Sequence, residues 1–384
     1  MNISLSEPHF FGDEIKYLKK CIKTKWISSS GKIVQQFEEK IKKYIGAKYV
    51  LGIINCTSSL QLCVRLLEPN RNDEILVPSI TFIASVNAVI YNNCNPVFMD
   101  CDENLLLDIN KVIDFINHET YFIKNYTYNK KTKKKILAII VVHTFGNLVN
   151  LDNNFLAILK KKNIKIIEDS AESLGSYYNK RKHPGTIGYL GCLSFNGNKL
   201  ITSGGGGMII FRNKELYRKA LYLSAQAKND PINFIHDEVG YNFRLSNLHA
   251  AIGCSQITKL NEVVKKKNKI HKIYKNKIDK IRGLEIMEKP KYCSSNYWLN
   301  ILIIDEKKYG LSKKAIIKKF EQHKIESRPI WYPNHLQKSL KKFQNYKIKN
   351  TIKMHNKCIC LPSSFNLTNS QQIKIINLLK NKFI

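Results

Sequence analysis

Short apolar runs alternate with helical patterns along the first two thirds of the chain. The run 49–54 follows a helical pattern at 37–45 and precedes another at 60–67. Further apolar runs that are expected to form strands lie at 75–77, 96–99, 136–142, 164–168, 192–195 and 208–211. Because strands that alternate with helices favour a mostly parallel sheet covered on both faces, this pattern predicts an α/β fold.

A different pattern follows residue 255. A Lys-rich helix is predicted over 257–278, an amphipathic strand over 297–304, and further helices over 313–323 and 370–381. Fewer and more amphipathic strands of this kind are typical of a smaller α+β domain.

These patterns divide the chain into three expected parts. They are an N-terminal arm (1–30), a large domain (31–255) and a small C-terminal domain (256–384). Within the large domain, the segment 121–135 is polar and basic without periodicity, which predicts a surface loop.

Composition excludes several classes of protein. The chain has 384 residues, and 43% of them are hydrophobic, which is ample for a buried core. No apolar run approaches the roughly 18 residues of a membrane span, and the N-terminus lacks the apolar segment of a secretory signal. Ten cysteines are present without a C-x-x-C pair. We therefore expect a cytoplasmic protein with reduced thiols, no metal site and no membrane insertion.

The formal net charge of +33 is compatible with two kinds of partner. A strongly basic chain can bind nucleic acid, and this is the alternative from outside the enzymes. However, the lysines are spread over many expected helices and loops, and no RNA-binding motif, zinc finger or heptad accompanies them. The charge therefore favours an anionic substrate, and nucleic acid is not expected as a partner.

The segment 55–59 follows an expected strand and opens an expected helix. Free backbone N–H groups and the helix dipole favour an anion at such a position. Thr57 and Ser58 can add hydroxyl donors. The alternative is an ordinary helix cap, because Ser and Thr are common at caps.

Two carboxylates, Glu168 and Asp169, end the strand predicted at 164–168, and Glu172 follows. Ligands of open α/β sheets lie at the carboxyl ends of the strands. A carboxylate buried there needs a cationic partner, and a protonated pyridine nitrogen is one such partner. The alternative is an Asp that caps a helix after the strand.

Lys199 follows another expected strand, five residues after Ser194, and four glycines occupy 204–207. A lysine near a strand end can act as a nucleophile toward a carbonyl group. The glycines match neither the dinucleotide-binding nor the P-loop pattern. In so basic a chain, one lysine beside a Gly-rich turn is weak support when taken alone.

A polar loop at 240–246, with Asn242 and Arg244, enters an expected helix of small residues. Small residues on a helix face indicate close packing, so a core or subunit contact is the plain interpretation.

The order of these motifs along the chain is more specific than any one of them. From about Pro8 to its end, the chain resembles the DegT/DnrJ/EryC1/StrS family of sugar-nucleotide aminotransferases. The resemblance implies the aspartate-aminotransferase fold, which is fold type I of the enzymes that use pyridoxal 5′-phosphate (PLP). The stretches VVHTFGNLVNLD, IIEDSAESLGSYY and LSFNGNKLITSGGGGMII resemble one branch in particular. Enzymes of that branch aminate UDP-4-keto-6-deoxy-N-acetylglucosamine to a UDP-N-acetylbacillosamine-type sugar, as used for legionaminic acid.

The resemblance implies roles for individual residues around the cofactor. Lys199 would carry PLP covalently, Asp169 would pair with the pyridinium nitrogen, and Glu172 would lie near the phenolic oxygen. The remaining implied contacts are Thr57, Ser58 and Ser194 with the phosphate, and Phe82 with one face of the ring.

The resemblance also implies partners. L-Glutamate would donate the amino group, and the sugar nucleotide would contact Arg328, Trp331 and His335. Asn242 would reach the phosphate of a neighbouring subunit, which implies a homodimer with shared active sites.

The chain departs from the family pattern at three positions. Cys56 stands where Gly is usual, Ser170 where Ala is usual, and Glu172 where Gln or His is common. The turn at Cys56 is therefore expected to be reshaped slightly.

Other enzymatic activities remain open from the sequence. A GDP-4-keto-6-deoxymannose aminotransferase, which makes perosamine, would carry the same motifs. A related dehydratase branch has His in place of the lysine, so Lys199 argues against it. A regulatory protein on the same scaffold is opposed by the intact Lys199 and Asp169.

Overall fold

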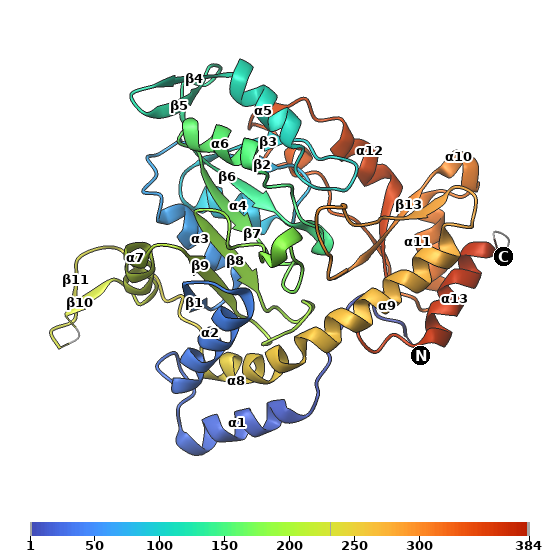
Figure 1. Ribbon diagram of the computed structural model, residues 1–384, viewed down its shortest axis with the longest axis horizontal. Helices are drawn as coiled ribbons and strands as arrows, with labels where there is room; N and C mark the ends of the chain where they lie inside the picture. Colours follow the sequence, from blue (N-terminus) through green and yellow to red (C-terminus); the bar gives the residue numbers. More distant parts are fainter. Residues whose placement is uncertain (1, 231, 382–384) are drawn as a thin grey trace.

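The computed structural model of the protein describes residues 2–230 and 232–381. A ten-stranded sheet forms its centre (Figure 1). The path through this sheet is β1 (Tyr49–Ile53), β9 (Gly207–Phe211), β8 (Leu190–Ser194), β7 (Lys165–Asp169), β6 (Lys135–Val142), β2 (Glu74–Pro78), β3 (Asn95–Met99) and β15 (Asn345–Tyr346). Strand β9 is antiparallel to both of its neighbours, and the pairs from β8 to β15 are parallel. The predicted mostly parallel α/β sheet is thereby confirmed.

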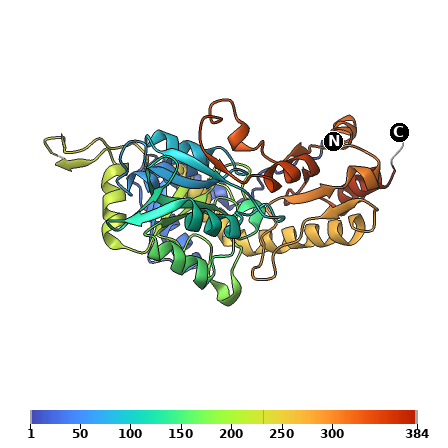
Figure 2. The same ribbon diagram turned by 90° about the horizontal axis from the view of Figure 1, so that it is seen from above.

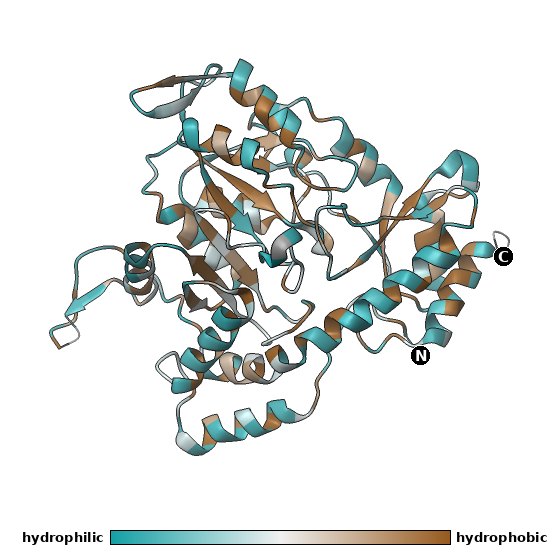
Figure 3. Cartoon of the chain, viewed as in Figure 1, coloured by the Kyte–Doolittle hydropathy of each residue, from teal (hydrophilic) through white to brown (hydrophobic). Residues whose placement is uncertain are grey.

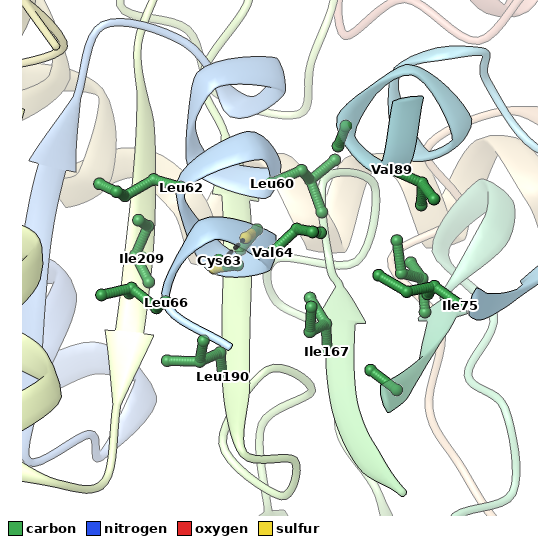
Figure 4. Close-up of a cluster of buried hydrophobic side chains, with 14 of the residues drawn as sticks. Leu60, Leu62, Cys63, Val64, Leu66, Ile75, Val89, Ile167, Leu190 and Ile209 are labelled. Carbon is green, nitrogen blue, oxygen red and sulfur yellow. Dashed lines mark hydrogen bonds between the residues drawn. The ribbon is translucent and has the colours of Figure 1, made fainter. Parts of the chain in front are cut away.

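Helices cover both faces of this sheet because its strands are apolar on both sides (Figure 3). They are α2 (Lys32–Ile45), α3 (Cys56–Arg65), α4 (Ala84–Tyr91), α5 (Ile109–His118), α6 (Asn153–Lys161), α7 (Lys214–Ser224) and α8 (Asn247–Gln256). Figure 4 shows α3 packing its side chains, among them Leu60 and Val64, on Ile167 of β7 and Ile209 of β9. This packing fixes the N-terminus of α3 next to the ends of the central strands.

A second, antiparallel sheet lies in the C-terminal part of the chain. Its order is β12 (Leu284–Ile286), β13 (Asn300–Ile304), β16 (Cys358–Leu361) and β14 (Arg328–Pro329). The accompanying helices are α9 (Leu260–Ile278), α10 (Glu306–Tyr309), α11 (Lys313–Gln322), α12 (Asn350–Lys357) and α13 (Asn369–Lys380). The long helix α9 runs from α8 to this smaller sheet in both views (Figures 1 and 2). A smaller α+β unit therefore follows the large sheet, while its boundary at residue 256 stays a prediction.

The N-terminal segment contacts both units. Helix α1 (Asp13–Thr24) packs on α8, and the residues before it run along the smaller sheet, where Ile3 bridges to Ile325. The described residues near both chain ends lie on the side of this sheet (Figure 2).

The predicted loop at 121–135 is instead a β-hairpin. Strands β4 (Thr120–Ile123) and β5 (Tyr126–Asn129) pair with each other, and β5 extends the large sheet beyond β6. The prediction was wrong because the usual alternation is inverted. The polar side chains of Thr127 and Asn129 are buried, whereas Tyr121 stacks on Tyr128 on the outer face.

A second hairpin, β10 (Lys228–Asp230) with β11 (Ile235–His236), projects from the body of the molecule (Figures 1 and 2). Within the described part of the chain, we find no helix that is both long and apolar enough to span a bilayer.

The buried carboxylate of Glu168 in β7 organises the loop that follows that strand. It accepts hydrogen bonds from the backbone of Gly185 (2.9 Å), Ile187 (2.8 Å) and Gly188 (2.5 Å) and one from His143 (3.1 Å). Burial by itself would raise the pKa of Glu168, but these donors lower it below the ordinary value. The loop therefore closes over the sheet next to Asp169.

The imidazole of His183, in the same loop, should make stability depend on pH. Burial lowers its pKa from 6.5 to about 4. Between these values the unfolded chain binds more protons than the folded chain, so the free energy of unfolding should fall as the pH drops. The loss is up to about 3 kcal/mol, and urea unfolding at several pH values measures it. His183→Gln should flatten this dependence, and an unchanged slope would show that another group causes it.

Candidate active site

A cavity of about 400 Å³ lies where the large sheet meets the smaller unit. The last residues of three adjacent parallel strands, Val142 of β6, Asp169 of β7 and Ser194 of β8, form part of its wall. The N-terminus of α3 adds another side. This is the position at which open α/β sheets bind their ligands.

Most of the residues predicted for the site meet at this cavity, although they are far apart in the sequence. Those on its wall are Thr57, Phe82, Asp169, Glu172, Ser194, Lys199, Arg328 and Trp331. Their assembly follows from the parallel sheet, because parallel strands place their carboxyl ends at one edge.

The N-terminus of α3 offers its backbone N–H groups to the cavity. Asn55 caps the helix by accepting a hydrogen bond from the backbone of Ser58 (2.8 Å). Ser58 is buried just behind the wall, whereas Cys56 and Thr57 line it. Because Cys56 is the first helical residue, its position does not require glycine. Burial raises the pKa of its thiol well above the ordinary value, so the thiol stays neutral.

The Gly-rich turn passes close to this helix terminus. The backbone of Gly206 donates to Ile54 (2.8 Å), and its φ of +106° lies in the region that favours glycine. A Cβ atom on Gly207 would lie 2.6 Å from the carbonyl carbon of Asn55 and from the backbone nitrogen of Cys56. The glycines therefore allow the turn and the helix to form one compact wall.

Asp169 is held in a fixed orientation at the bottom of the cavity. One carboxylate oxygen accepts a hydrogen bond from the hydroxyl of Ser85 in α4 (2.7 Å), and the other accepts from the backbone of Ala171 (3.1 Å). The Ser85 hydroxyl is also 3.1 Å from that of Thr81. A carboxylate has more acceptor positions than these two donors fill, so it can still bind a cationic group in the cavity.

Lys199 and Glu172 form an ion pair in the wall of the cavity. The distance from Lys199 Nζ to Glu172 Oε1 is 3.2 Å, and Glu172 Oε2 accepts from the backbone of Phe145 (2.8 Å). Burial raises the pKa of Glu172, although the ammonium of Lys199 acts in the opposite direction. The lysine head group also lies 4.0 Å from the centroid of the Trp298 ring.

The mouth of the cavity is aromatic and cationic. Trp331 stacks on Phe145 with a centroid distance of 4.5 Å, and Phe82 is largely exposed at the rim. Arg328 is also exposed and pairs with Glu326 at 2.5 Å. Flat aromatic faces and a guanidinium suit a large anionic ligand.

Besides Ser58, two further predicted residues do not line this wall. His335 is buried elsewhere, with its Nδ1 atom 2.6 Å from the hydroxyl of Ser79. Asn242 lies in the strand-like segment that bridges to Ala225. The resemblance assigns Asn242 to the site of a second subunit. Because the structure contains one chain, that role remains a prediction.

The sequence reasoning missed several residues of the wall. No role was predicted for Trp298 or Phe145, or for Leu5 and Ser6 of the N-terminal arm, and all four line the cavity. For Ser85 a signal existed, since it lies three residues after Phe82 in the segment that carries that predicted contact. No group of three or more potential ligands for a metal ion occurs among the described residues.

The donors present fit PLP. A helix N-terminus suits its phosphate, a strand-end carboxylate suits its pyridinium nitrogen, and a lysine can join its aldehyde. Fold and site together define a PLP-dependent aminotransferase. The profile of one such family, the DegT/DnrJ/EryC1/StrS aminotransferases, matches residues 10–380. The chain belongs to this family of sugar aminotransferases, as the sequence predicted.

Individual relatives cover nearly the whole chain. EpsN of Bacillus subtilis, which is named as a pyridoxal phosphate-dependent aminotransferase, is 33% identical over 387 residues, 99% of this chain and 96% of EpsN. GDP-perosamine synthase of Escherichia coli O157:H7 is 31% identical over 374 residues, 97% of this chain and 96% of the synthase.

A third relative has a UDP-linked sugar in its name. It is UDP-4-amino-4,6-dideoxy-N-acetyl-beta-L-altrosamine transaminase of Campylobacter jejuni, 31% identical over 307 residues, 79% of this chain and 77% of that protein. Among solved structures, Helicobacter pylori PseC, an aminotransferase involved in the biosynthesis of pseudoaminic acid, has a TM-score of 0.88 at 22% identity. The match covers 99% of this chain and 98% of that chain. This likeness confirms the predicted fold.

A side chain at Gly207 should push the Gly-rich turn away from the N-terminus of α3. Gly207→Ala places a methyl group against the backbone of Asn55 and Cys56, so we expect the free energy of unfolding to fall by about 1–3 kcal/mol. Denaturant unfolding measures this change. Gly197→Ala is the control, because a Cβ atom there meets open space. Equal stability of the two variants would contradict the close approach.

Proposed function

We propose that the protein transfers the amino group of L-glutamate to C4 of a UDP-4-keto-6-deoxy-N-acetylhexosamine, giving a UDP-N-acetylbacillosamine-type sugar. The observation that carries the proposal is the placement of Lys199, Asp169 and the α3 N-terminus around one cavity. The similarity to sugar-nucleotide aminotransferases supports the substrate class.

In the proposal, each residue around the cofactor has a separate role. Bound PLP supplies an electron sink. Asp169 keeps the proton on the ring nitrogen, and the bond from Ser85 orients its carboxylate. Lys199 moves the proton between Cα of the amino donor and the cofactor, as a general acid and base. Glu172, placed beside Lys199, holds the lysine head group and would lie near the phenolic oxygen.

Further residues would bind and orient the cofactor. Thr57, Ser58 and Ser194 would hold the phosphate, with the backbone of α3 supplying the favourable dipole. Phe82 at the rim would cover one face of the ring.

The mouth of the cavity is assigned to the sugar nucleotide. Arg328 would pair with the anionic diphosphate, and Trp331 would pack on an apolar or planar part of the substrate. His335 would act indirectly, because its bond with Ser79 and the bond from Asn334 to the Ser79 backbone tie this loop to the large sheet.

A second candidate substrate is GDP-4-keto-6-deoxymannose. The specific observation in its favour is the 31% identity with GDP-perosamine synthase over 97% of the chain. The UDP substrate is supported by the branch-specific stretches and by the Campylobacter transaminase.

The proposal includes a cytoplasmic homodimer with shared active sites. Asn242 would reach the phosphate of the second subunit. Neither nucleic acid nor a membrane is needed as a partner.

Removal of the lysine head group tests the chemistry. Lys199→Ala should lose the visible absorbance of lysine-bound PLP and should lower kcat on the order of a thousandfold, because the acid and base is gone. A spectrum taken after addition of PLP, together with a transamination assay, measures both. Lys214→Ala, at the start of α7, is the control. Unchanged turnover in the Lys199 variant would refute the assignment.

Turnover with two substrates tests the nucleotide. With L-glutamate as donor, mass spectrometry should find the aminated product from UDP-4-keto-6-deoxy-N-acetylglucosamine. GDP-4-keto-6-deoxymannose should give kcat/KM at least roughly tenfold lower, equivalent to about 1.4 kcal/mol of discrimination. A preference for the GDP sugar would replace the first substrate by the second and leave the aminotransferase chemistry intact.

A further inference from the structure

The head group of Lys199 has a second neighbour besides Glu172. Its Nζ atom lies 4.0 Å from the centroid of the Trp298 ring, within the range of a cation–π interaction. Trp298 is only 5% exposed, so the contact is removed from bulk water. Trp298 comes from the smaller unit, whereas Glu172 and Lys199 lie in turns that follow β7 and β8 of the large sheet.

Trp298 is fixed from several directions. Its indole N–H donates to the carbonyl of Asn198, the residue before Lys199 (2.7 Å). Its backbone N–H donates to the side chain of Asn296 (2.8 Å), and its carbonyl accepts from the buried ammonium of Lys267 (3.1 Å). These hydrogen bonds fix the position of the Trp298 ring relative to the turn that carries Lys199.

The same segment is tied to Glu172. The side-chain amide of the fully buried Asn296 donates to the carbonyls of Glu172 and Leu174, each at 2.9 Å. Asn296 thus links the backbones of the two residues whose side chains contact the lysine head group, Glu172 and Trp298. The carboxylate of Glu172 and the ring of Trp298 together form one preorganised binding site for an ammonium group.

An indole face and a carboxylate attract an ammonium in different ways. A carboxylate oxygen can accept its proton, whereas the ring face attracts the charge without competing for the proton. A site that combines an indole face with a carboxylate stabilises the free ammonium and leaves its proton available for transfer. The lysine in the proposed reaction needs such a place whenever it is not joined to the cofactor.

We propose that Trp298 is a positioning residue that holds the ammonium of Lys199 whenever this lysine is released from PLP. The inference rests on the proposed function. If Lys199 joined PLP, its nitrogen would bond to the aldehyde carbon and the aldehyde oxygen would leave as water, so Lys199 would no longer offer Trp298 a free ammonium. The contact with Trp298 then lowers the cost of releasing the lysine and favours exchange with the amino donor.

Equilibrium binding to the cofactor-free protein separates this role from a merely structural one. PLP joins the lysine and gives up the contact, whereas pyridoxamine 5′-phosphate carries no aldehyde and leaves the contact in place. Trp298→Leu should therefore bind PLP roughly tenfold more tightly, equivalent to about 1.4 kcal/mol, with unchanged affinity for pyridoxamine phosphate. The half-reaction with glutamate should become slower. Trp298→Phe keeps an aromatic face and should resemble the wild type.

The other outcomes overturn the inference in distinct ways. If Trp298→Leu binds PLP and pyridoxamine phosphate more weakly by the same factor, Trp298 has a structural role. If Trp298→Phe behaves like Trp298→Leu, the bond to Asn198 is responsible and not the ring face. Trp298→Met, which fills irregular space without a ring, replaces the leucine variant if that variant folds poorly. Wild-type protein that binds PLP without a visible band would contradict the proposed function itself. Trp26→Leu, an exposed tryptophan far from the cavity, is the control.

Discussion

The structure depends on how it satisfies the carboxylates that strand β7 and the turn after it carry into the interior. Burying a carboxylate is costly unless donors or a cation compensate for the lost water. Glu168 receives backbone N–H groups and a histidine, and so orders the neighbouring loop. Asp169 receives one hydroxyl and one N–H, and keeps acceptor capacity toward the cavity. Glu172 receives one N–H and the ammonium of Lys199. The same requirement thus yields a scaffold contact, an acceptor that faces the cavity and a lysine partner within five residues.

The cavity is a joint product of two units. The large sheet supplies the strand ends and the α3 N-terminus, which are the parts suited to PLP. The smaller unit supplies Trp298 next to the lysine, and Arg328 and Trp331 at the mouth. This division matches the chemistry of the family, in which the cofactor is common to all members and the sugar nucleotide differs. In the proposal, contacts for the common step lie on the more regular scaffold, and contacts for the variable substrate lie on β14 and the loop after it.

The net charge of +33 has little to do with the chemistry of the site. The cavity itself holds Lys199 and Arg328 together with two carboxylates, Asp169 and Glu172. Lys267, outside the cavity, is a buried lysine whose ammonium needs hydrogen-bond acceptors in place of water. Its ammonium is hydrogen-bonded to two backbone carbonyls, and burial lowers its pKa to about 7. Among so many lysines, only the position of Lys199 relative to Ser194 and Asp169 singled it out as the proposed catalytic lysine.

The sequence by itself determined the strands, the helices around them and most of the cofactor end of the site. It could do so because buried parallel strands are continuous apolar runs and because their carboxyl ends meet at one edge. The hairpin at β4 and β5 escaped prediction, since its polar side chains point inward and its tyrosines outward. The tertiary structure alone decided that Trp298 and the N-terminal arm belong to the cavity wall, that Ser85 orients Asp169, and that His335 lies elsewhere. Those placements depend on how the smaller unit and the arm pack on the sheet, and no local pattern in the chain encodes such long-range contacts.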